Sequence, residues 1–439
     1  RFPTLFARLL NAGVLALLSI SLNAAPLLSQ QDRSQALELY QSAIALLESG
    51  DFAGAEEKIE TLLTDFAGMP QALNVAGVIA DLREKPEQAI EYFERALSVR
   101  DDFIDARSNL ARLYTKTKQY EEAKRQFRRV LQFDPTHIPS LKDLAEVGYE
   151  TGDFEAALES ATRALAQLPT DTDLLLLLAK TQFKLKREEE AAETTLRLKE
   201  LLGQDGERLH ALGLMLLDNA RYGDAVTVLR EAAERQGRDP EIVNSMGIGY
   251  GLARKVNQAI SSFQESVRLR PLGPEGYFHL ALSYGMQGRF EEASIELRKV
   301  LRLDRNFTEA AHHLGISLYK QGLEEEAWPF FEQVVKRQPD RTETLYYQAL
   351  IRFQEADYKG SLALLTRVLE LQEDHISAHY KAAQVYAKLG RRAQAHRLLQ
   401  KFKQLEVQQE LSRKERFHIY AGVGDELSVF GSKAPDRND

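Results

Sequence analysis

The sequence predicts an all-α fold in which antiparallel helix pairs stack into a solenoid. Three observations lead to this prediction. A small residue recurs every 34 positions, and a second series of small residues follows twelve positions after the first. Within each period, apolar residues recur at helical spacing. Repetition at this period is typical of stacked helical hairpins, in which each repeat contacts only its neighbours.

Both series of small residues run along the chain without a change of register. The first consists of Ala43, Gly77, Ala111, Ala145, Ala179, Gly213, Gly247, Ala281, Gly315, Ala349 and Ala383, and the second of Ala55, Ala89, Ala123, Ala157, Ala191, Ala225, Ala259, Ala293, Ala327, Ser361 and Ala395. They define eleven repeats over residues 36–409: 36–69, 70–103, 104–137, 138–171, 172–205, 206–239, 240–273, 274–307, 308–341, 342–375 and 376–409.

The residues before the array have the layout of a secretory signal peptide. Arg1 and Arg8 make the start positive, residues 14–20 form an apolar run, and Ala24 and Ala25 offer small residues for cleavage. We therefore expect a signal peptide over residues 1–25, a linker over 26–35, and a periplasmic or secreted protein. The apolar stretch is short for a membrane span, and an uncleaved signal anchor is the alternative. We expect no other contact with a membrane.

One repeat, residues 308–341, shows why two helices are expected in each. Leu314 and Leu318 belong to a first apolar face at helical spacing, and Gly322 then interrupts the pattern. A second face contains Phe331, and Pro339 ends it. Each repeat therefore predicts two helices of about a dozen residues, which need neighbouring repeats to bury their apolar faces.

The small residues predict close contact between the two helices of a repeat. We expect the Ala or Gly of the first helix to face the Ala of the second, with larger side chains around them. Two sets of large residues also keep the period, namely Phe93, Phe127, Phe263 and Phe331, and Tyr114, Tyr250, Tyr284 and Tyr386. A large side chain at a small site should cost on the order of 1–3 kcal/mol or more.

The chain after the array is expected to close it and then lose regular structure. Helical character continues past residue 409, which predicts a C-terminal capping helix over 410–420. Gly422, Gly424, Gly431 and Pro435 then predict a loose tail over 421–439.

These features resemble the tetratricopeptide repeat family. The resemblance rests on the 34-residue period and on three recurring motifs. The first is a Leu-Gly or Leu-Ala pair, at Leu212-Gly213, Leu280-Ala281 and Leu314-Gly315, and the second is a turn, at Gly152-Asp153-Phe154 and Gly288-Arg289-Phe290. The third is a proline near the end of a repeat, at Pro135, Pro169, Pro271 and Pro339. It implies a right-handed superhelix with a concave groove that binds ligands. The fifth repeat departs from the pattern, because Gln182, Glu188 and Thr195 replace apolar or aromatic residues. This predicts either a flexible point in the array or a local binding feature.

Composition argues against several classes of function. The net charge is −8, and the basic clusters are interleaved with acids, so we expect no nucleic-acid partner. The absence of cysteine excludes disulfides, cysteine-ligated zinc and thiol catalysis. Gly247, Gly249 and Gly251 lie inside a helical pattern, where a nucleotide-binding loop is not expected. We therefore expect no catalytic residues, no cofactor and no metal site, and hence no enzyme.

An acidic series at the repeat period has two interpretations. It comprises Glu207, Glu241, Glu275, Glu309 and Glu343. One interpretation is a surface that attracts basic ligands. The favoured one is helix capping, in which Asn306 with Glu309 and Asp340 with Glu343 form capping boxes.

The candidate partner-binding residues lie on the other face of the first helices, in the last four repeats. Spacings of 34, 4 and 7 residues put them in one row: Phe278, Leu282, His312, Ile316, Tyr319, Tyr346, Leu350, Phe353 and Tyr380. By the family resemblance, this face lines the groove. A contiguous apolar row exposed to water often marks a binding site. The alternative is that these side chains pack against the adjacent first helix. Earlier repeats carry Ser108, Arg112, Lys142 and Glu146 on this face, so the groove is expected to change from charged to aromatic.

The sequence as a whole favours a non-catalytic scaffold that binds a partner protein or peptide in its groove. The alternative, which the family resemblance implies, is a structural subunit of an envelope export or polysaccharide-secretion complex. Aromatic side chains could equally hold a glycan.

Overall fold

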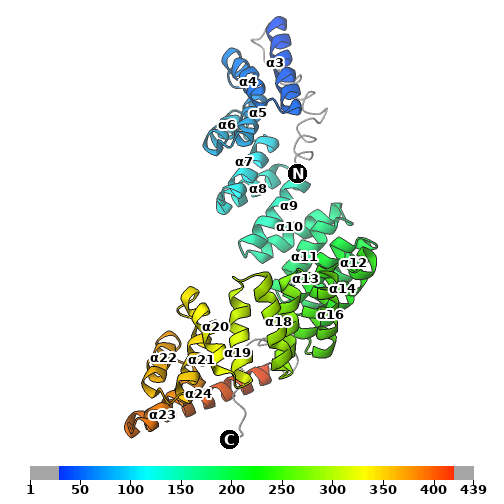
Figure 1. Cartoon of the computed structure of the whole chain (residues 1–439). Coiled ribbons are helices and arrows are strands. Elements are labelled where there is room, and N and C mark those ends of the chain that lie inside the picture. The colour runs from blue at the N-terminus through cyan, green and yellow to red at the C-terminus, as the bar shows by residue number, and fades with distance from the viewer. Residues whose placement is uncertain (1–28, 420–439) are drawn as a thin grey trace. The chain divides into compact units, whose positions relative to one another are not determined.

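The computed structural model describes residues 29–419, with side chains to residue 409, and within these residues it contains 22 α-helices and no β-strand. The predicted all-α repeat solenoid is confirmed, since the helices follow one another as eleven consecutive pairs (Figure 1). The first helices of the pairs are α3 (Gln30–Ser49), α5 (Pro70–Leu82), α7 (Ile104–Lys116), α9 (Ile138–Glu150), α11 (Thr172–Lys184), α13 (Gly206–Asp218), α15 (Pro240–Leu252), α17 (Pro274–Met286), α19 (Thr308–Lys320), α21 (Thr342–Gln354) and α23 (Ile376–Lys388). The second helices are α4 (Phe52–Asp65), α6 (Pro86–Val99), α8 (Tyr120–Phe133), α10 (Phe154–Gln167), α12 (Glu188–Leu202), α14 (Tyr222–Gln236), α16 (Val256–Leu269), α18 (Phe290–Leu303), α20 (Glu324–Arg337), α22 (Tyr358–Leu371) and α24 (Arg392–Ile419).

The chain divides into two compact units, Arg1–Leu201 and Leu202–Asp439. The boundary falls within α12, the second helix of the atypical fifth repeat. Among the helices between residues 30 and 419, none combines the length and the apolar composition that spanning a bilayer requires.

Two helices at the ends of the array are longer than the repeats require. The first begins at Gln30, because Ser29 accepts a hydrogen bond from the backbone N–H of Asp32, whose side chain bonds back to the Ser29 N–H. Residues 30–35, expected to be linker, are therefore helical. The helical character expected over 410–420 belongs to the C-terminal part of α24, because no Gly or Pro interrupts residues 392–419. The expected signal peptide (1–25) and loose tail (421–439) lie outside the described residues.

Several successive first helices touch one another. In the second unit α15 contacts α17, α17 contacts α19, and α21 contacts α23, whereas contacts between successive second helices are weaker. These first helices therefore lie closer to one another than the second helices of the same repeats do.

In every repeat, one residue at the same position of the turn between the two helices has a left-handed backbone conformation. This residue has φ between 55° and 85° at Gly50, Glu84, Lys118, Gly152, Lys186, Ala220, Arg254, Gly288, Gly322, Ala356 and Gly390. Glycine adopts this conformation without the steric penalty that a Cβ brings. Only five of these eleven positions are glycine, so the fold imposes the conformation on the other six.

The small residue of the first helix packs against a larger side chain sixteen positions later, in addition to facing the small series twelve positions later. A Cβ added at Gly77 would lie 2.5 Å from the ring of Phe93, and one at Gly247 would lie 2.5 Å from Phe263. The Ala series is buried beside this contact. Its one exception, Ser361, donates a hydrogen bond of 2.8 Å to the carbonyl oxygen of Ala349. At Gly77 and Gly247 the small site therefore makes room for an aromatic ring, whereas at Gly213 it makes room for Leu229.

Candidate partner-binding surface

All nine candidate residues lie on the first helices of the second unit. Phe278 and Leu282 are on α17, and His312, Ile316 and Tyr319 are on α19; Tyr346, Leu350 and Phe353 are on α21, and Tyr380 is on α23. We call these nine residues the aromatic row. Eight of them are at least partly exposed, and Tyr380 retains 40% of its accessible area.

His312 does not lie on the surface as expected. Its side chain is 3% exposed, and its Nδ1 lies 2.9 Å from the hydroxyl oxygen of Thr344 on the next first helix. Its ring also packs edge-on against Phe331. The 34-residue spacing placed it correctly on the helix, but only tertiary packing shows that the residue is buried and that its Nδ1 is already hydrogen-bonded. His312 therefore supports the surface from beneath.

The rings of the aromatic row form a contact series that crosses from repeat to repeat. Phe278 lies 5.0 Å from Phe307 and 5.7 Å from His313, measured between ring centroids. Tyr319 lies 5.4 Å from Tyr347 of the next repeat. Aromatic pairs at these separations stabilise by about 0.5–1.5 kcal/mol beyond the area they bury. Apart from the buried His312, the row thus packs against adjacent helices and still leaves part of each ring uncovered, so the two sequence interpretations are compatible.

Toward the end of the array, the aromatic row has a lysine side chain beside its rings. The ring of Tyr346 lies tilted against that of His375, with centroids 5.1 Å apart, and Tyr380 lies 5.2 Å from Phe402 on α24. The Nζ of Lys381 sits 4.6 Å above the ring of Phe353. Burial lowers the pKa of this half-buried lysine. The surface at α21 and α23 is therefore aromatic with one lysine in it.

The sequence interpretation missed a second periodic series that supports the row. His279, His313, Tyr347 and Lys381 are also 34 residues apart, each one position after a member of the row. These residues fill the interface between successive first helices, as Tyr347 does between Tyr319 and Phe331. The period could have revealed the series, but not that its members lie between helices.

Burial sets the charge state of the titratable groups in this region. It lowers the pKa of His313 to about 4, against the opposing attraction of Glu309. It lowers the pKa of His312 to about 2, helped by the neighbouring His313 and Arg341. Burial also raises the pKa of Tyr319 and of Tyr346 to about 12, with Tyr347 adding to both. At neutral pH these groups are uncharged.

The acidic series does not form the expected capping boxes. The N-caps of α19 and α21 are Phe307 and Arg341, one residue later than expected, and neither makes a side-chain cap hydrogen bond. Asn306 and Asp340 therefore lie one position too early to reach the helix N–H groups.

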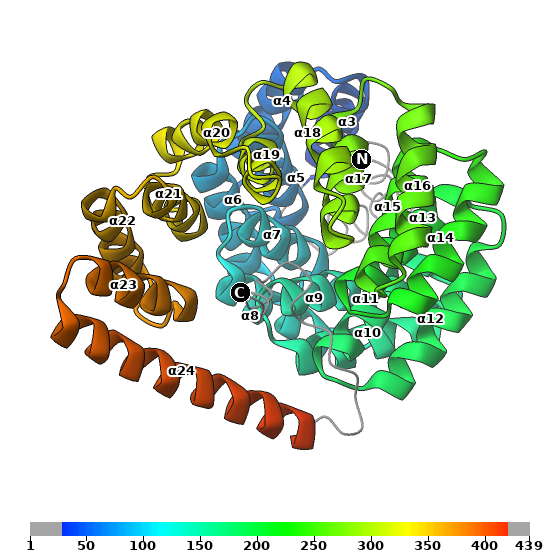
Figure 2. The same ribbon diagram turned by 60° about the horizontal axis from the view of Figure 1, so that its bottom comes forward.

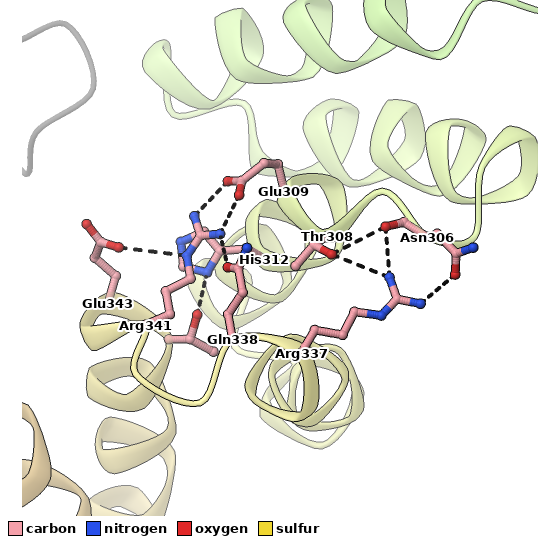
Figure 3. Close-up of polar contacts among 9 residues, drawn as sticks. Asn306, Thr308, Glu309, His312, Arg337, Gln338, Arg341 and Glu343 are labelled. Atoms are coloured by element: carbon pink, nitrogen blue, oxygen red, sulfur yellow. Dashed lines mark hydrogen bonds and ion pairs between the residues drawn. The ribbon is translucent and has the colours of Figure 1, made fainter. Parts of the chain in front are cut away.

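Glu309 instead accepts two hydrogen bonds, of 2.6 Å and 2.7 Å, from the guanidinium of Arg341. Figure 3 shows Arg341 between Glu309 and Glu343, while Arg337 extends to Asn306 and Thr308. The hydrogen bonds from Arg341 lower the pKa of the Glu309 carboxyl. In the seventh repeat, Glu241 similarly pairs with Arg270 at 3.0 Å. Each of these two carboxylates is therefore already paired with an arginine of its own repeat.

The corresponding face in the first unit is charged, as expected, but its charges are paired. Arg112 contacts Asp143 at 2.6 Å, and Lys142 contacts Asp171 at 2.8 Å. Ser108 is buried beside Ser140. Because these groups satisfy one another, the first unit offers fewer unsatisfied features to a ligand than the aromatic row does.

Among the described residues, no group of three or more His, Cys, Asp or Glu side chains is arranged to hold a metal ion.

Comparison with known families and structures adds the following. Family models described as "Tetratricopeptide repeat" match residues 82–146 and 149–213, residues 40–103, and residues 274–307. A model described as "Anaphase-promoting complex, cyclosome, subunit 3" matches residues 320–402. No curated protein sequence matches the chain.

Three solved structures illustrate the similarity of fold. YrrB, described as a TPR protein with an unusual peptide-binding site, is 19% identical, with 43% of this chain and 97% of that chain covered and a TM-score of 0.37. A tetratricopeptide repeat protein from Parabacteroides merdae is 16% identical, with coverage of 65% and 99% and a TM-score of 0.36. The APC/C hetero-tetramer Cut9-Hcn1 is 14% identical, with coverage of 89% and 90% and a TM-score of 0.38. TM-scores this low say nothing about function.

Proposed function

The chain is a tetratricopeptide repeat protein, and we propose that it is a non-catalytic scaffold that binds a partner polypeptide through the aromatic row of its second unit. The fold is one that serves protein–protein interaction. The observation that carries the proposal is the row itself: partly exposed rings on four successive first helices, α17, α19, α21 and α23. Contiguous apolar surface of this kind is uncommon on soluble proteins unless it binds something.

The chemistry of the row favours an extended polypeptide with apolar or aromatic side chains. Its tyrosines are uncharged at neutral pH, since burial raises the pKa of Tyr319 and of Tyr346 to about 12. The most exposed side chains at this surface would contact the ligand first, for example Met286, which is 43% exposed, and Tyr380, which is 40% exposed. Methionine and tyrosine are both well suited to such surfaces, because one adapts its shape and the other combines apolar area with a hydroxyl.

We further propose that the protein is exported to the periplasm or secreted. The support is the leader-like composition of residues 1–25. Comparing the mass of the protein recovered from its native compartment with that of the full chain would test cleavage near Ala25.

Site-specific photo-crosslinking tests the binding surface. We expect a photoreactive phenylalanine analogue at position 380 or 286 to capture the same polypeptide. The control position is Ile295, which is 52% exposed on the second helix α18. Equal capture at position 295 would contradict the proposal, and capture of a glycan would favour the secretion-complex alternative.

Truncation of the rings gives an independent test. We expect Tyr346→Ala combined with Phe353→Ala to weaken capture at least tenfold, because buried aromatic contacts are often worth about 2 kcal/mol each. Leu272→Ala combined with Leu303→Ala is the control, since both leucines are exposed away from the row. If the two double variants capture equally, the aromatic row is not the site.

A further inference from the structure

The first and last repeats, counted with the whole of α3 and of α24, carry the extremes of charge in the array. Residues 30–69 contain eight acids and two bases, a net charge of −6. Residues 376–419 contain ten lysines and arginines and three acids, a net charge of +7. The nine intervening repeats lie between −5 and +4. The chain therefore has an acidic first repeat and a basic last one, a separation that its overall charge of −8 conceals.

In the first repeat, four acids are available to an outside partner. Glu38 and Glu48 on α3, and Glu57 and Glu60 on α4, are exposed and have no ion-pair partner among the described side chains. The other acids of this repeat form ion pairs, helix caps or hydrogen bonds within the chain. Glu56, for example, binds Arg83 and Lys85 of the second repeat.

The bases of the last repeat are similarly unneutralised. Lys388, Arg392, Arg397 and Lys403 are exposed, and no described side chain forms an ion pair with them. Lys401 has one contact, of 3.6 Å, with Glu373. Figure 2 shows α24 as a long helix in red, and at 28 residues it is more than twice the length of its 13-residue partner α23. Much of this basic helix therefore has no first helix of its own repeat beside it.

The third repeat shows that net charge alone does not produce such a surface. Residues 104–137 have a net charge of +4, yet their cations are held by acids. Asp101 binds both Arg107 and Arg129, and Asp153 lies 3.8 Å from Lys124 and 3.7 Å from Arg128. The last repeat differs because its cations lack these partners.

We propose that copies of this chain associate head to tail, with the basic last repeat of one copy docked on the acidic first repeat of the next. Opposite charges across an interface steer association and fix its register. The two surfaces belong to one chain, carry charges of similar size, and are each left unneutralised by the fold. Such a contact is heterologous, so it can extend beyond a dimer.

Sedimentation velocity of the full chain tests this directly. At an ionic strength of about 0.1 M, where the Debye length is about 10 Å, we expect the weight-average sedimentation coefficient to rise with protein concentration. At about 1 M, where that length falls to about 3 Å, we expect the monomer. A concentration-independent monomer at the lower ionic strength would overturn the proposal.

A charge swap identifies the partner as a second copy. Variant A carries Lys388→Glu, Arg392→Glu, Arg397→Glu and Lys403→Glu, which changes the last repeat from +7 to −1. Variant B carries Glu38→Lys, Glu48→Lys, Glu57→Lys and Glu60→Lys, which changes the first repeat from −6 to +2. We expect each variant alone to be monomeric and the equimolar mixture to associate. A mixture that stays monomeric, while both variants keep the wild-type circular dichroism spectrum, would refute the interface.

Two further arms separate this interface from other effects of charge. The control variant Arg302→Glu, Arg305→Glu, Lys320→Glu and Lys336→Glu changes the net charge as much as variant A does, at exposed positions of the eighth and ninth repeats. It should associate like the wild type, and loss of association would show a non-specific charge effect and reject the proposal. Vesicles containing about one fifth phosphatidylserine form the second arm. A wild-type chain that stays monomeric but co-sediments with them, while variant A does not, would replace the second copy with an anionic membrane.

Discussion

The aromatic ring of Phe331 occupies the space that a side chain at Gly315 would need. A Cβ added at residue 315 would lie 2.6 Å from Cε1 of this ring, which is closer than real Cβ contacts allow. Phe331 is fully buried, so it has no free space into which to move. The contact joins the first and second helices of the ninth repeat, and its equivalents recur at Gly77 with Phe93 and at Gly247 with Phe263.

We expect Gly315→Leu to destabilise the ninth repeat by about 3 kcal/mol or more, and Gly315→Ala to destabilise it by at most about 2 kcal/mol. The alanine gains about 1 kcal/mol of helix propensity, but overpacking costs about 1–3 kcal/mol. The single tryptophan, Trp328 on α20, reports unfolding of this region by fluorescence in urea. Gly285→Ala on α17 is the matched control, because no atom lies within 4 Å of its added Cβ. It should be neutral or stabilising, as should the exposed change Glu325→Gln. Equal unfolding midpoints for Gly315→Leu and Glu325→Gln would contradict the packing described here.

We expect Ala356→Gly to stabilise the tenth repeat by about 1 kcal/mol. Ala356 has φ of 63°, a conformation that costs a residue with a Cβ roughly 1–2 kcal/mol, partly offset by the entropy that glycine adds to the unfolded chain. Hydrogen exchange of peptides covering α21 and α22 measures the local effect. Ala363→Gly, at an exposed site inside α22, should have the opposite sign, since glycine costs about 1 kcal/mol in a helix interior. Two changes of the same sign would show that the turn conformation is not the cause.

We expect the second unit to lose stability as the pH falls from about 6.5 toward 4. Burial lowers the pKa of His313 to about 4 and that of His312 to about 2, so the unfolded chain binds protons that the folded chain excludes. A lowered folded-state pKa means that the stabilisation is complete above the unfolded pKa near 6.5 and is lost below it. The loss can reach about 1.4 kcal/mol per pH unit for each histidine. Below this window the Glu309 carboxyl adds to the loss, because Arg341 lowers its pKa.

Urea unfolding followed by Trp328 fluorescence at pH 7.5, 6 and 5 measures this dependence. His313→Gln should flatten it, because glutamine does not titrate, whereas the exposed His396→Gln should leave it unchanged. An unfolding free energy that stays constant over this range would show that neither histidine is held neutral by burial.

We expect Thr195→Val to stabilise the fifth repeat by about 1 kcal/mol. The Oγ1 of Thr195 is buried without a hydrogen-bond partner, and valine has nearly the same shape without the unsatisfied hydroxyl. Thr181→Val is the matched control, since the Oγ1 of Thr181 donates to the carbonyl oxygen of Leu177 at 2.7 Å. Hydrogen exchange over α11 and α12 should slow only for Thr195→Val. Faster exchange would mean that this hydroxyl finds a partner in solution.

The aromatic row shows how far sequence periodicity reaches and where it stops. Spacings of 34, 4 and 7 residues placed Tyr346, Phe353 and Tyr380 on the correct helices, and the structure leaves each partly exposed. The same reasoning placed His312 among them, although it is buried and bonded to Thr344. The spacing of residues along a helix gives the side of that helix on which each side chain lies. Its exposure depends on which side chains of the neighbouring helix pack against that side.

The repeat, its period and its two-helix composition follow from the amino-acid sequence alone, because these depend on local apolar spacing and on residues such as Gly322 that end a helix. Which side chains meet across that framework depends on how the helices pack. The ring of Phe331 fills the space beside Gly315, and Glu309 pairs with Arg341 across 32 residues of chain instead of capping its own helix. Contacts of this kind are set by the distance and angle between packed helices, and an offset of one residue in a helix start is enough to redirect them.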